Sequence, residues 1–219
     1  MIMEGLPAKR PWITTSIVVL ALIMLLPGCF RKPTPLDPRE ITEYQGVRLT
    51  PATSLRENSI GGVQSIDIDG YTLAIRGAVK TPLVLSYDEV LDRERYQKLV
   101  TLNCVEGWKA VILWEGVLIR DLLDAAQPNS DAVTVIFHAY DGYTTSLPLA
   151  TVQDKDLLLA HKANDNVLPE RLGFPFIVVA EDKLGYKWAR WVTAIELSSD
   201  AGYKGFWEQR GYSNDASIK

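Results

Sequence analysis

The chain has 219 residues, a formal net charge of -4 and a hydrophobic content of 47%. These values exclude a disordered chain, and the length suits one compact domain behind a leader. The negative charge, without any clustered basic stripe, predicts that nucleic acid is not a partner. Of the two cysteines, Cys29 falls in the predicted leader, so Cys104 has no disulfide partner within the mature chain.

Residues 1–29 have the pattern of an export signal. Lys9-Arg10 precedes an almost wholly apolar run, residues 12–26, which is shorter than the roughly 20 residues that span a bilayer. The run ends in Leu26-Pro27-Gly28-Cys29, which resembles a bacterial lipoprotein cleavage site whose cysteine is lipidated. An uncleaved signal anchor is the alternative. Both predict a domain in the bacterial cell envelope that is tethered to the membrane and faces the periplasm or the cell exterior.

Residues 30–65 are predicted to be a linker and an N-terminal arm, because residues 31–38 are rich in proline and charge. One domain is then predicted over residues 66–219. Residues 66–70 and 71–77 alternate apolar and polar side chains, as half-buried strands do. Ser86 to Glu89 has the form of a capping box, which predicts a short helix through Leu91.

The remaining elements are mostly short strands. Strands are predicted over residues 96–102, 111–114, 133–137, 176–180 and 188–197, and helices over 118–126 and, more loosely, 149–160. Strands outnumber helices, and they do not alternate strictly with them. The pattern therefore predicts an α+β fold of mixed β-sheets with short helices.

Cys104 lies where the strand over residues 96–102 ends in a loop, in the sequence Thr101-Leu102-Asn103-Cys104-Val105-Glu106-Gly107-Trp108. A lone cysteine is by default a small buried hydrophobe. The polar neighbours, and a glycine that allows close approach of a ligand, favour a functional site. A cysteine nucleophile partnered by His138 or His161 is disfavoured, because no thiol-hydrolase signature surrounds it.

Five blocks of sequence resemble, in the same order, the sulfite-oxidase-type molybdopterin oxidoreductase domain. They are residues 102–108, 137–149, 173–176, 185–192 and 205–213. The resemblance implies the sulfite-oxidase-like molybdopterin-binding fold and a molybdopterin-dependent enzyme with a molybdenum–molybdopterin cofactor. It also implies that Cys104 is the catalytic metal ligand, since thiolate is the soft donor that molybdenum requires.

The resemblance further implies contacts to the cofactor from Asn58, Asn103, His138, Lys187, Trp188 and Arg190. Lys187 and Arg190 would bind the pterin phosphate. The alternative is that both are solvated cations on a strand. Asn58 precedes two glycines and is equally typical of a turn, and His138 is nearly as well explained by a structural role. Trp188 would contribute its indole N–H or stack.

Two positions depart from the family pattern. Leu172 and Ile177 stand where many members have a histidine or asparagine and an arginine. The loss of two polar contacts puts sulfite in doubt as the substrate.

The predicted function is transfer of an oxygen atom to or from a small substrate, by sulfoxide or N-oxide reduction or by sulfur-anion oxidation. No haem or iron–sulfur motif is present, so a separate membrane cytochrome or quinone-linked protein is expected to exchange the electrons. The alternative is a non-catalytic lipoprotein that uses the same fold to bind a pterin or a protein partner.

Overall fold

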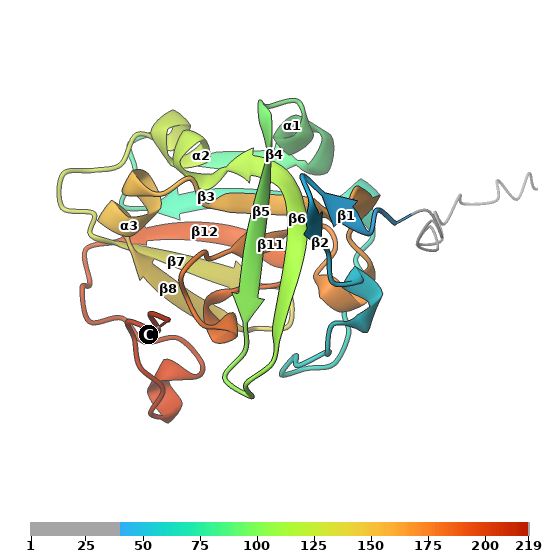
Figure 1. Ribbon diagram of the computed structural model, residues 1–219. Helices are drawn as coiled ribbons and strands as arrows, with labels where there is room; N and C mark the ends of the chain where they lie inside the picture. Colours follow the sequence, from blue (N-terminus) through green and yellow to red (C-terminus); the bar gives the residue numbers. More distant parts are fainter. Residues whose placement is uncertain (1–39, 219) are drawn as a thin grey trace, which may run out of the picture. The chain divides into compact units, whose positions relative to one another are not determined.

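The computed structural model describes residues 40–218 (Figure 1). The predicted export signal and most of the predicted linker lie outside the described residues, so both stay predictions. Within residues 40–218, no helix has the length and apolar character that crossing a bilayer requires.

The first sheet has the strand order β10-β9-β6-β5, with β11 added on β9, and all its pairs are antiparallel. Its two longest strands, β5 and β6, form a hairpin with β5 at the edge of the sheet, and the hairpin runs down the front of the molecule in Figure 1. Gly116 of β6 lets β9 approach closely, because a Cβ there would lie 2.2 Å from the Leu159 carbonyl oxygen. The strands are β5 (Arg95–Asn103), β6 (Lys109–Leu118), β9 (Leu158–Ala163), β10 (Asn166–Val167) and β11 (Ile177–Val179).

The second sheet has the order β4-β3-β12-β7-β8. Strands β12 and β3 pair in parallel and every other pair is antiparallel, so the sheet is mixed. Its strands run across the direction of β5 and β6 in Figure 1. They are β3 (Thr72–Gly77), β4 (Leu83–Ser86), β7 (Thr134–Ala139), β8 (Thr144–Pro148) and β12 (Val192–Ser198).

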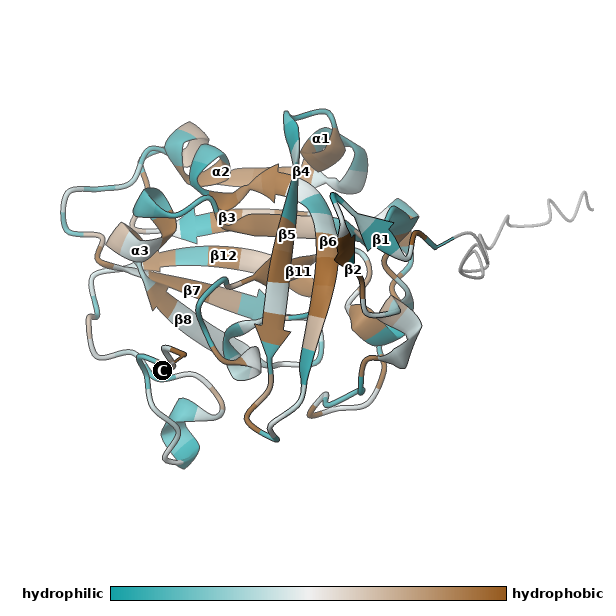
Figure 2. Ribbon diagram, in the orientation of Figure 1, coloured by the Kyte–Doolittle hydropathy of each residue, from teal (hydrophilic) through white to brown (hydrophobic). Residues whose placement is uncertain are grey.

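One hydrophobic core joins the two sheets and the short helices. It takes buried residues from both sheets, including Ile112 of β6 and Ile195 of β12, and Figure 2 shows the apolar colouring concentrated on these strands. Helix α2 (Ile119–Ala126) adds its apolar face, while α1 (Tyr87–Leu91) begins with the predicted capping box. Helix α3 (Leu149–Asp154) follows β8. The predicted α+β fold of mixed sheets is confirmed.

Short elements fill the connections. The N-terminal arm forms a two-residue hairpin of β1 (Glu43–Tyr44) and β2 (Val47–Arg48). Five 3₁₀ turns are found in the described residues: η1 (Ala52–Ser54), η2 (Ile68–Gly70), η3 (Glu170–Leu172), η4 (Gly185–Lys187) and η5 (Glu208–Arg210).

Three predicted elements were wrong in part. Residues 66–70 contain no strand: residues 68–70 form the turn η2, because Asp67 accepts a hydrogen bond from the Asp69 amide and caps the turn. The helix predicted over residues 149–160 ends at Asp154, and its last three residues, 158–160, begin the buried strand β9. The strand predicted from Trp188 begins only at Val192, since Trp191 has a left-handed backbone with φ 49°.

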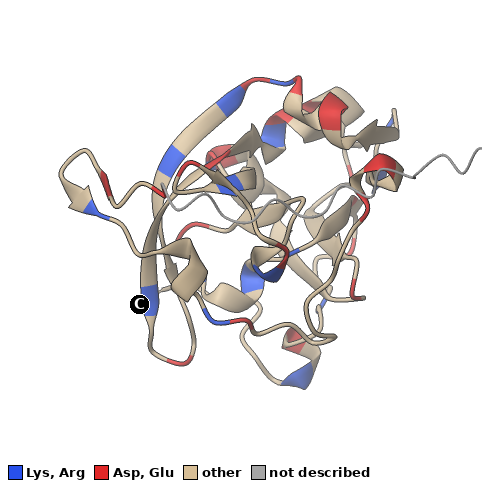
Figure 3. Ribbon diagram, turned by 90° about the vertical axis from the view of Figure 1, so that its right-hand side faces the viewer, with Lys and Arg blue, Asp and Glu red and all other residues tan. Residues whose placement is uncertain are grey.

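Charged residues of both signs occur along the described chain. Figure 3 shows lysine and arginine interspersed with aspartate and glutamate in that view.

Candidate functional site

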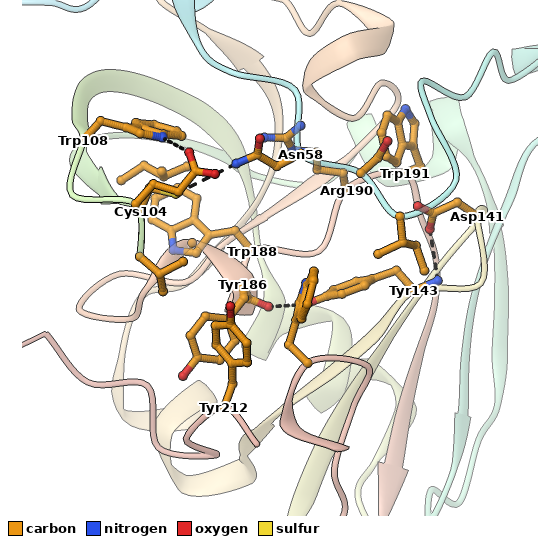
Figure 4. Close-up of a pocket in the computed structure, with 17 residues that line it drawn as sticks. Asn58, Cys104, Trp108, Asp141, Tyr143, Tyr186, Trp188, Arg190, Trp191 and Tyr212 are labelled. Carbon is orange, nitrogen blue, oxygen red and sulfur yellow. Dashed lines mark hydrogen bonds between the residues drawn. The ribbon is translucent and has the colours of Figure 1, made fainter. Parts of the chain in front are cut away.

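A cavity of about 400 Å³ opens at the end of the β5–β6 hairpin, next to the loops that follow β7 and precede β12. Figure 4 shows side chains from five separate segments turned toward it. Its polar lining includes Cys104, Arg190 and the carboxylates of Glu106 and Asp141. Aromatic side chains form most of the remaining wall: Trp108, Tyr143, Tyr186, Trp188, Trp191, Trp207 and Tyr212.

Cys104 is the first residue after β5 and belongs to the tight turn that joins β5 to β6. Its amide donates to the Trp108 carbonyl at 2.9 Å, and its own carbonyl accepts from the Gly107 amide at 3.1 Å. Gly107 has φ 85°, which favours glycine. Glu106 accepts a hydrogen bond from Trp108 Nε1 at 3.0 Å. These contacts fix the turn and present the half-buried Cys104 thiol to the cavity.

Asn58 reaches the cavity from a segment that is distant in sequence, residues 53–59, which we call the strap. Its side-chain amide nitrogen lies 4.0 Å from Cys104 Sγ, the outer limit of a hydrogen bond to sulfur. The strap also packs against the β7–β8 turn just beyond Asn58, since a Cβ on Gly61 would lie 3.3 Å from Asp141 Cβ. The structure therefore brings Asn58 and Cys104 together, as the sequence prediction requires.

Arg190 is the one cation among the residues that line the cavity in the described part of the chain. Its guanidinium donates to the carbonyl oxygens of Arg171 at 3.2 Å and Arg56 at 3.3 Å. Burial lowers the pKa of Arg190, and the nearby Glu57 carboxylate partly opposes that shift. Gly173 makes this placement possible, because a Cβ there would lie 2.7 Å from Arg190 Cβ.

The wall opposite Cys104 is a set of interlocking aromatic rings. Tyr186 and Tyr212 pack edge to face with ring centroids 5.2 Å apart, and Trp207 lies 5.2 Å from Tyr212. The Tyr143 hydroxyl donates to the Tyr186 carbonyl, and burial raises the pKa of Tyr143. Burial also raises the pKa of Tyr186 to about 12. Both phenols are therefore neutral near pH 7, and their rings present apolar faces to the cavity.

Trp188 lines the cavity, but its indole N–H is used within the protein. Trp188 Nε1 donates to the Lys183 carbonyl at 3.1 Å, and its ring packs on Trp114 at 5.6 Å. Of the two predicted roles, the structure favours stacking. Asn103 lies outside the cavity lining and donates to the Thr101 carbonyl at 3.1 Å. Successive side chains of a strand point to opposite faces, so Asn103 and Cys104 diverge.

Lys187 also lies outside the cavity lining, contrary to its predicted contact with a phosphate. Its side chain is fully buried, with Nζ 2.5 Å from Glu208 Oε1 and 3.0 Å from both the Ser146 carbonyl oxygen and Asn214 Oδ1. Burial lowers the pKa of Lys187, which Glu208 partly offsets. We therefore assign the Lys187 side chain to an internal ion pair with Glu208.

His138 lies within β7, just beyond the strand that was predicted over residues 133–137. Its Nε2 is 3.0 Å from Glu196 Oε2, and it lines a separate surface hollow together with Arg76 and Tyr140. Burial lowers the pKa of His138, and Glu196 partly opposes this effect. The placement gives no support to a contact with the cofactor.

Sequence reasoning singled out Cys104, Asn58, Trp188 and Arg190, which do line the cavity, but it missed much of the aromatic wall. Trp191 and Tyr212 were quoted only as parts of family blocks, and the dense aromatic content of those blocks was the available signal. The departures Leu172 and Ile177 are each 1% exposed and belong to the core. Neither residue lines the cavity.

No group of three or more histidine, cysteine, aspartate or glutamate side chains forms a candidate metal site within residues 40–218. The cavity instead offers a single thiol, one guanidinium and broad aromatic faces. Such a lining suits a large planar ligand that is held by stacking and by one soft donor atom.

Known proteins share this fold. The structure resembles the sulfane dehydrogenase SoxCD from Paracoccus pantotrophus, with a TM-score of 0.64 over 90% of this chain and 61% of that chain, at 21% identity. In sequence, the uncharacterized oxidoreductase YuiH of Bacillus subtilis is 33% identical over 147 residues, which cover 67% of this chain and 74% of YuiH.

Two further relatives are named for methionine sulfoxide. The putative protein-methionine-sulfoxide reductase subunit YedZ1 of Azospira oryzae is 30% identical and matches 69% of this chain. The protein-methionine-sulfoxide reductase catalytic subunit MsrP of Campylobacter jejuni is 24% identical and matches 70% of this chain. The matched part is 57% of the length of each of these two relatives.

A model of the oxidoreductase molybdopterin binding domain matches residues 60–207, which is well over half of the chain. The predicted resemblance is thereby confirmed. The chain is an enzyme, and the alternative of a non-catalytic binding module is not retained. It belongs to the oxidoreductase molybdopterin-binding domain family.

Proposed function

We propose that this oxidoreductase reduces a neutral sulfoxide to the corresponding thioether, in the bacterial cell envelope and tethered to the membrane. The reaction consumes two electrons and two protons and releases water. The electrons would come from a separate membrane cytochrome or quinone-linked protein. The observation that carries the proposal is the Cys104 thiol in the wall of the aromatic cavity, where one soft ligand is available to a metal.

The residues present fit a molybdenum–pterin group, which the family implies. Cys104 would supply the sulfur ligand, and the Asn58 amide lies 4.0 Å from its thiol. The rings of Trp188 and Trp207 would stack on the pterin. When bound, the group supplies the oxygen-atom acceptor and the two-electron reservoir.

The protein's own contribution is orientation and charge. Asn58 and Arg190 supply polar contacts on the same side of the cavity as Cys104, while the aromatic wall keeps water from the reacting atoms. The pterin that the family implies would carry a phosphate, and Arg190 is the one cation in the described lining that could bind it.

The charge of the lining favours a neutral substrate over a sulfur anion. Glu106 and Asp141 line the cavity together with Arg190, so carboxylates outnumber the cation. An anionic substrate would meet two carboxylates, and Arg190, the one cation in the described lining, would already be occupied by the pterin phosphate. The names of two relatives, which refer to protein-methionine-sulfoxide reductase, support the same direction of reaction.

The first test is elemental analysis of the protein made in a host that synthesises the cofactor. We expect about one molybdenum atom per chain in the wild type and loss of most of it in Cys104→Ser, since serine offers a hard oxygen in place of thiolate. Protein from a host unable to make the cofactor is the blank. Full metal content in Cys104→Ser would refute the assigned ligand.

The loaded enzyme is then assayed in both directions. We expect methionine sulfoxide to be reduced with a low-potential dye as donor, and sulfite to be oxidised poorly with an electron-accepting dye. Efficient sulfite oxidation without sulfoxide reduction would contradict the proposed substrate class. Loss of molybdenum in Cys104→Ser would still support the metal site in that case.

The location is tested separately. Export and tethering rest on Lys9-Arg10, the apolar run and Cys29, all of which lie outside the described residues. We expect Cys29→Ala to move the protein out of the membrane fraction if Cys29 carries a lipid. Retention of Cys29→Ala in the membrane would indicate the uncleaved anchor, and a wild-type protein found outside the envelope would contradict export.

A further inference from the structure

We propose that Arg171 is a positioning residue that holds the strap, and Asn58 with it, beside Cys104. The inference rests on the proposed function for its importance, because Cys104 matters as the metal ligand. Its geometry belongs to the protein without any ligand and is tested there.

The strap has few contacts of its own to keep it in place. Within the described part of the chain, no backbone–backbone hydrogen bond involves residues 56–66. The nearest such bond is that of the Leu55 amide to the Ala52 carbonyl, at 3.3 Å in turn η1. Leu55 is buried in the core, but the residues that follow it along the strap are not. Other groups must therefore fix the course of the chain between Leu55 and Asn58.

Arg171 supplies that restraint from turn η3. Its Nη1 donates to the Thr53 carbonyl oxygen, and its Nη2 donates to the Leu55 carbonyl oxygen. A planar guanidinium presents two parallel donors in a fixed geometry, so it sets both the position and the direction of the strap. A lysine ammonium in the same place is a point donor and cannot reproduce this two-point contact.

The backbone of turn η3, which carries Arg171, is itself held by two hydrogen bonds. The Arg171 carbonyl accepts a hydrogen bond from Arg190 Nη1 at 3.2 Å, and the preceding carbonyl, of Glu170, accepts one from Trp191 Nε1 at 2.8 Å. Arg190 and Trp191 both line the cavity. Turn η3 is therefore fixed to the cavity wall. Because Arg171 extends from this turn, its hydrogen bonds hold the strap at a fixed position relative to the wall.

A second contact completes the path to Asn58. Arg190 Nη2 donates to the Arg56 carbonyl at 3.3 Å, while the exposed Arg56 side chain lies 3.4 Å from Glu106. Exposed ion pairs contribute little, so the three guanidinium-to-carbonyl contacts dominate. The strap is held at residues 53, 55 and 56, and Asn58 follows two residues later.

The test uses the full chain made without the cofactor and measures how fast iodoacetamide alkylates Cys104. Peptide mass analysis separates Cys104 from Cys29. We expect Arg171→Lys to raise the Cys104 rate about ten-fold, the factor that corresponds to one lost charge-assisted hydrogen bond. Arg120→Lys is the matched control, since Arg120 pairs with Asp156 from helix α2 and lies outside the cavity lining. Its rate should equal that of the wild type.

A double variant distinguishes positioning from general loosening. Asn58→Ala should raise the Cys104 rate by itself, and Arg171→Lys should add nothing on the Asn58→Ala background if Arg171 acts through Asn58. An Arg171→Lys rate at the wild-type value, or effects that multiply in the double variant, would overturn the proposal. Arg171→Met, which keeps the apolar stem, serves if the lysine variant does not fold. All alkylation rates are measured at urea concentrations far below the unfolding midpoint of each variant.

The outcome does not depend on the metal. If the wild type fails to bind molybdenum, the proposed function fails while the thiol measurements still decide the role of Arg171. In a host that loads the enzyme, Arg171→Lys should also reduce the molybdenum content.

Discussion

The buried ion pair of Lys187 and Glu208 gives the sharpest prediction of stability. Both side chains are 0% exposed and their charged atoms lie 2.5 Å apart. Glu208→Gln keeps the shape of the side chain and an oxygen that can accept from Lys187 and Thr145, but it removes the negative charge. A buried ammonium without a counter-ion then remains, which costs about 3–5 kcal/mol of unfolding free energy.

That loss is a large fraction of the total stability of a domain, which is about 5–15 kcal/mol. The double variant Lys187→Met/Glu208→Gln should recover most of it, because no uncompensated charge is left in the core. Urea unfolding measures both values, provided that the slope with denaturant is unchanged. Lys155→Met is the control: its pair with Asp182 is exposed, so we expect a change within about 0.5 kcal/mol.

Loss of the Glu208 charge should also affect the cavity. Residues 203–214, the C-terminal arm, carry Trp207 and Tyr212 to the wall, and Glu208 attaches the arm to the interior. Glu208→Gln should therefore change the near-ultraviolet dichroism of the aromatic cluster and lower cofactor loading. A cost below about 1 kcal/mol in Glu208→Gln would refute the reasoning, since it would mean that the pair is not a buried pair of charges.

Three further outcomes follow from single contacts. Burial lowers the pKa of His161 to about 4, so between about pH 6.5 and 4 the unfolded chain binds a proton that the folded chain does not. The free energy of unfolding should therefore fall by about 3 kcal/mol as pH drops from about 6.5 to 4. Urea unfolding measures this fall, and His161→Gln should flatten the pH dependence over the same range. Gly173→Ala should cost about 1–3 kcal/mol and lower molybdenum loading, because its φ is 109° and the new Cβ would strike Arg190. A loading equal to that of the wild type would contradict the second effect. Ser86→Ala should lower stability by about 1 kcal/mol through loss of the α1 cap, visible as a melting temperature about 2–4 °C lower; an unchanged melting temperature would contradict it.

The local sequence pattern was sufficient to predict elements that are determined by residues close together in sequence. The capping box at Ser86 and the apolar spacing of α2 gave both helices nearly at their observed bounds. The strand that precedes Cys104 was also predicted, because β5 mixes β-branched and apolar residues. The failures share a cause: in β9 and in the turn before β12, tertiary pairing overrode a local pattern that fitted two structures.

The site was harder to predict, because residue type does not reveal direction. Asn103 and Cys104 are adjacent, yet only Cys104 faces the cavity, which follows from the pleat of β5 and not from either side chain. Lys187 looked like a phosphate ligand because it lies three residues before Arg190 in a family block. Its partner Glu208 is 21 residues further along the chain, and no local pattern links the two.

The arrangement of charges explains how a small domain builds this cavity from loops. Five segments that are distant in sequence form its wall, and few of them are stiffened by a ladder of backbone hydrogen bonds at the cavity itself. Charged side chains take that role: Arg171 and Arg190 hold the strap through carbonyl oxygens, and the Lys187–Glu208 pair holds the C-terminal arm. Arg171 and Lys187 lie outside the cavity lining, and Arg190, the one cation in the described lining, already donates to two carbonyl oxygens. The same contacts that fix the wall therefore leave the cavity poor in free positive charge, which is the property that favours a neutral oxide as the substrate.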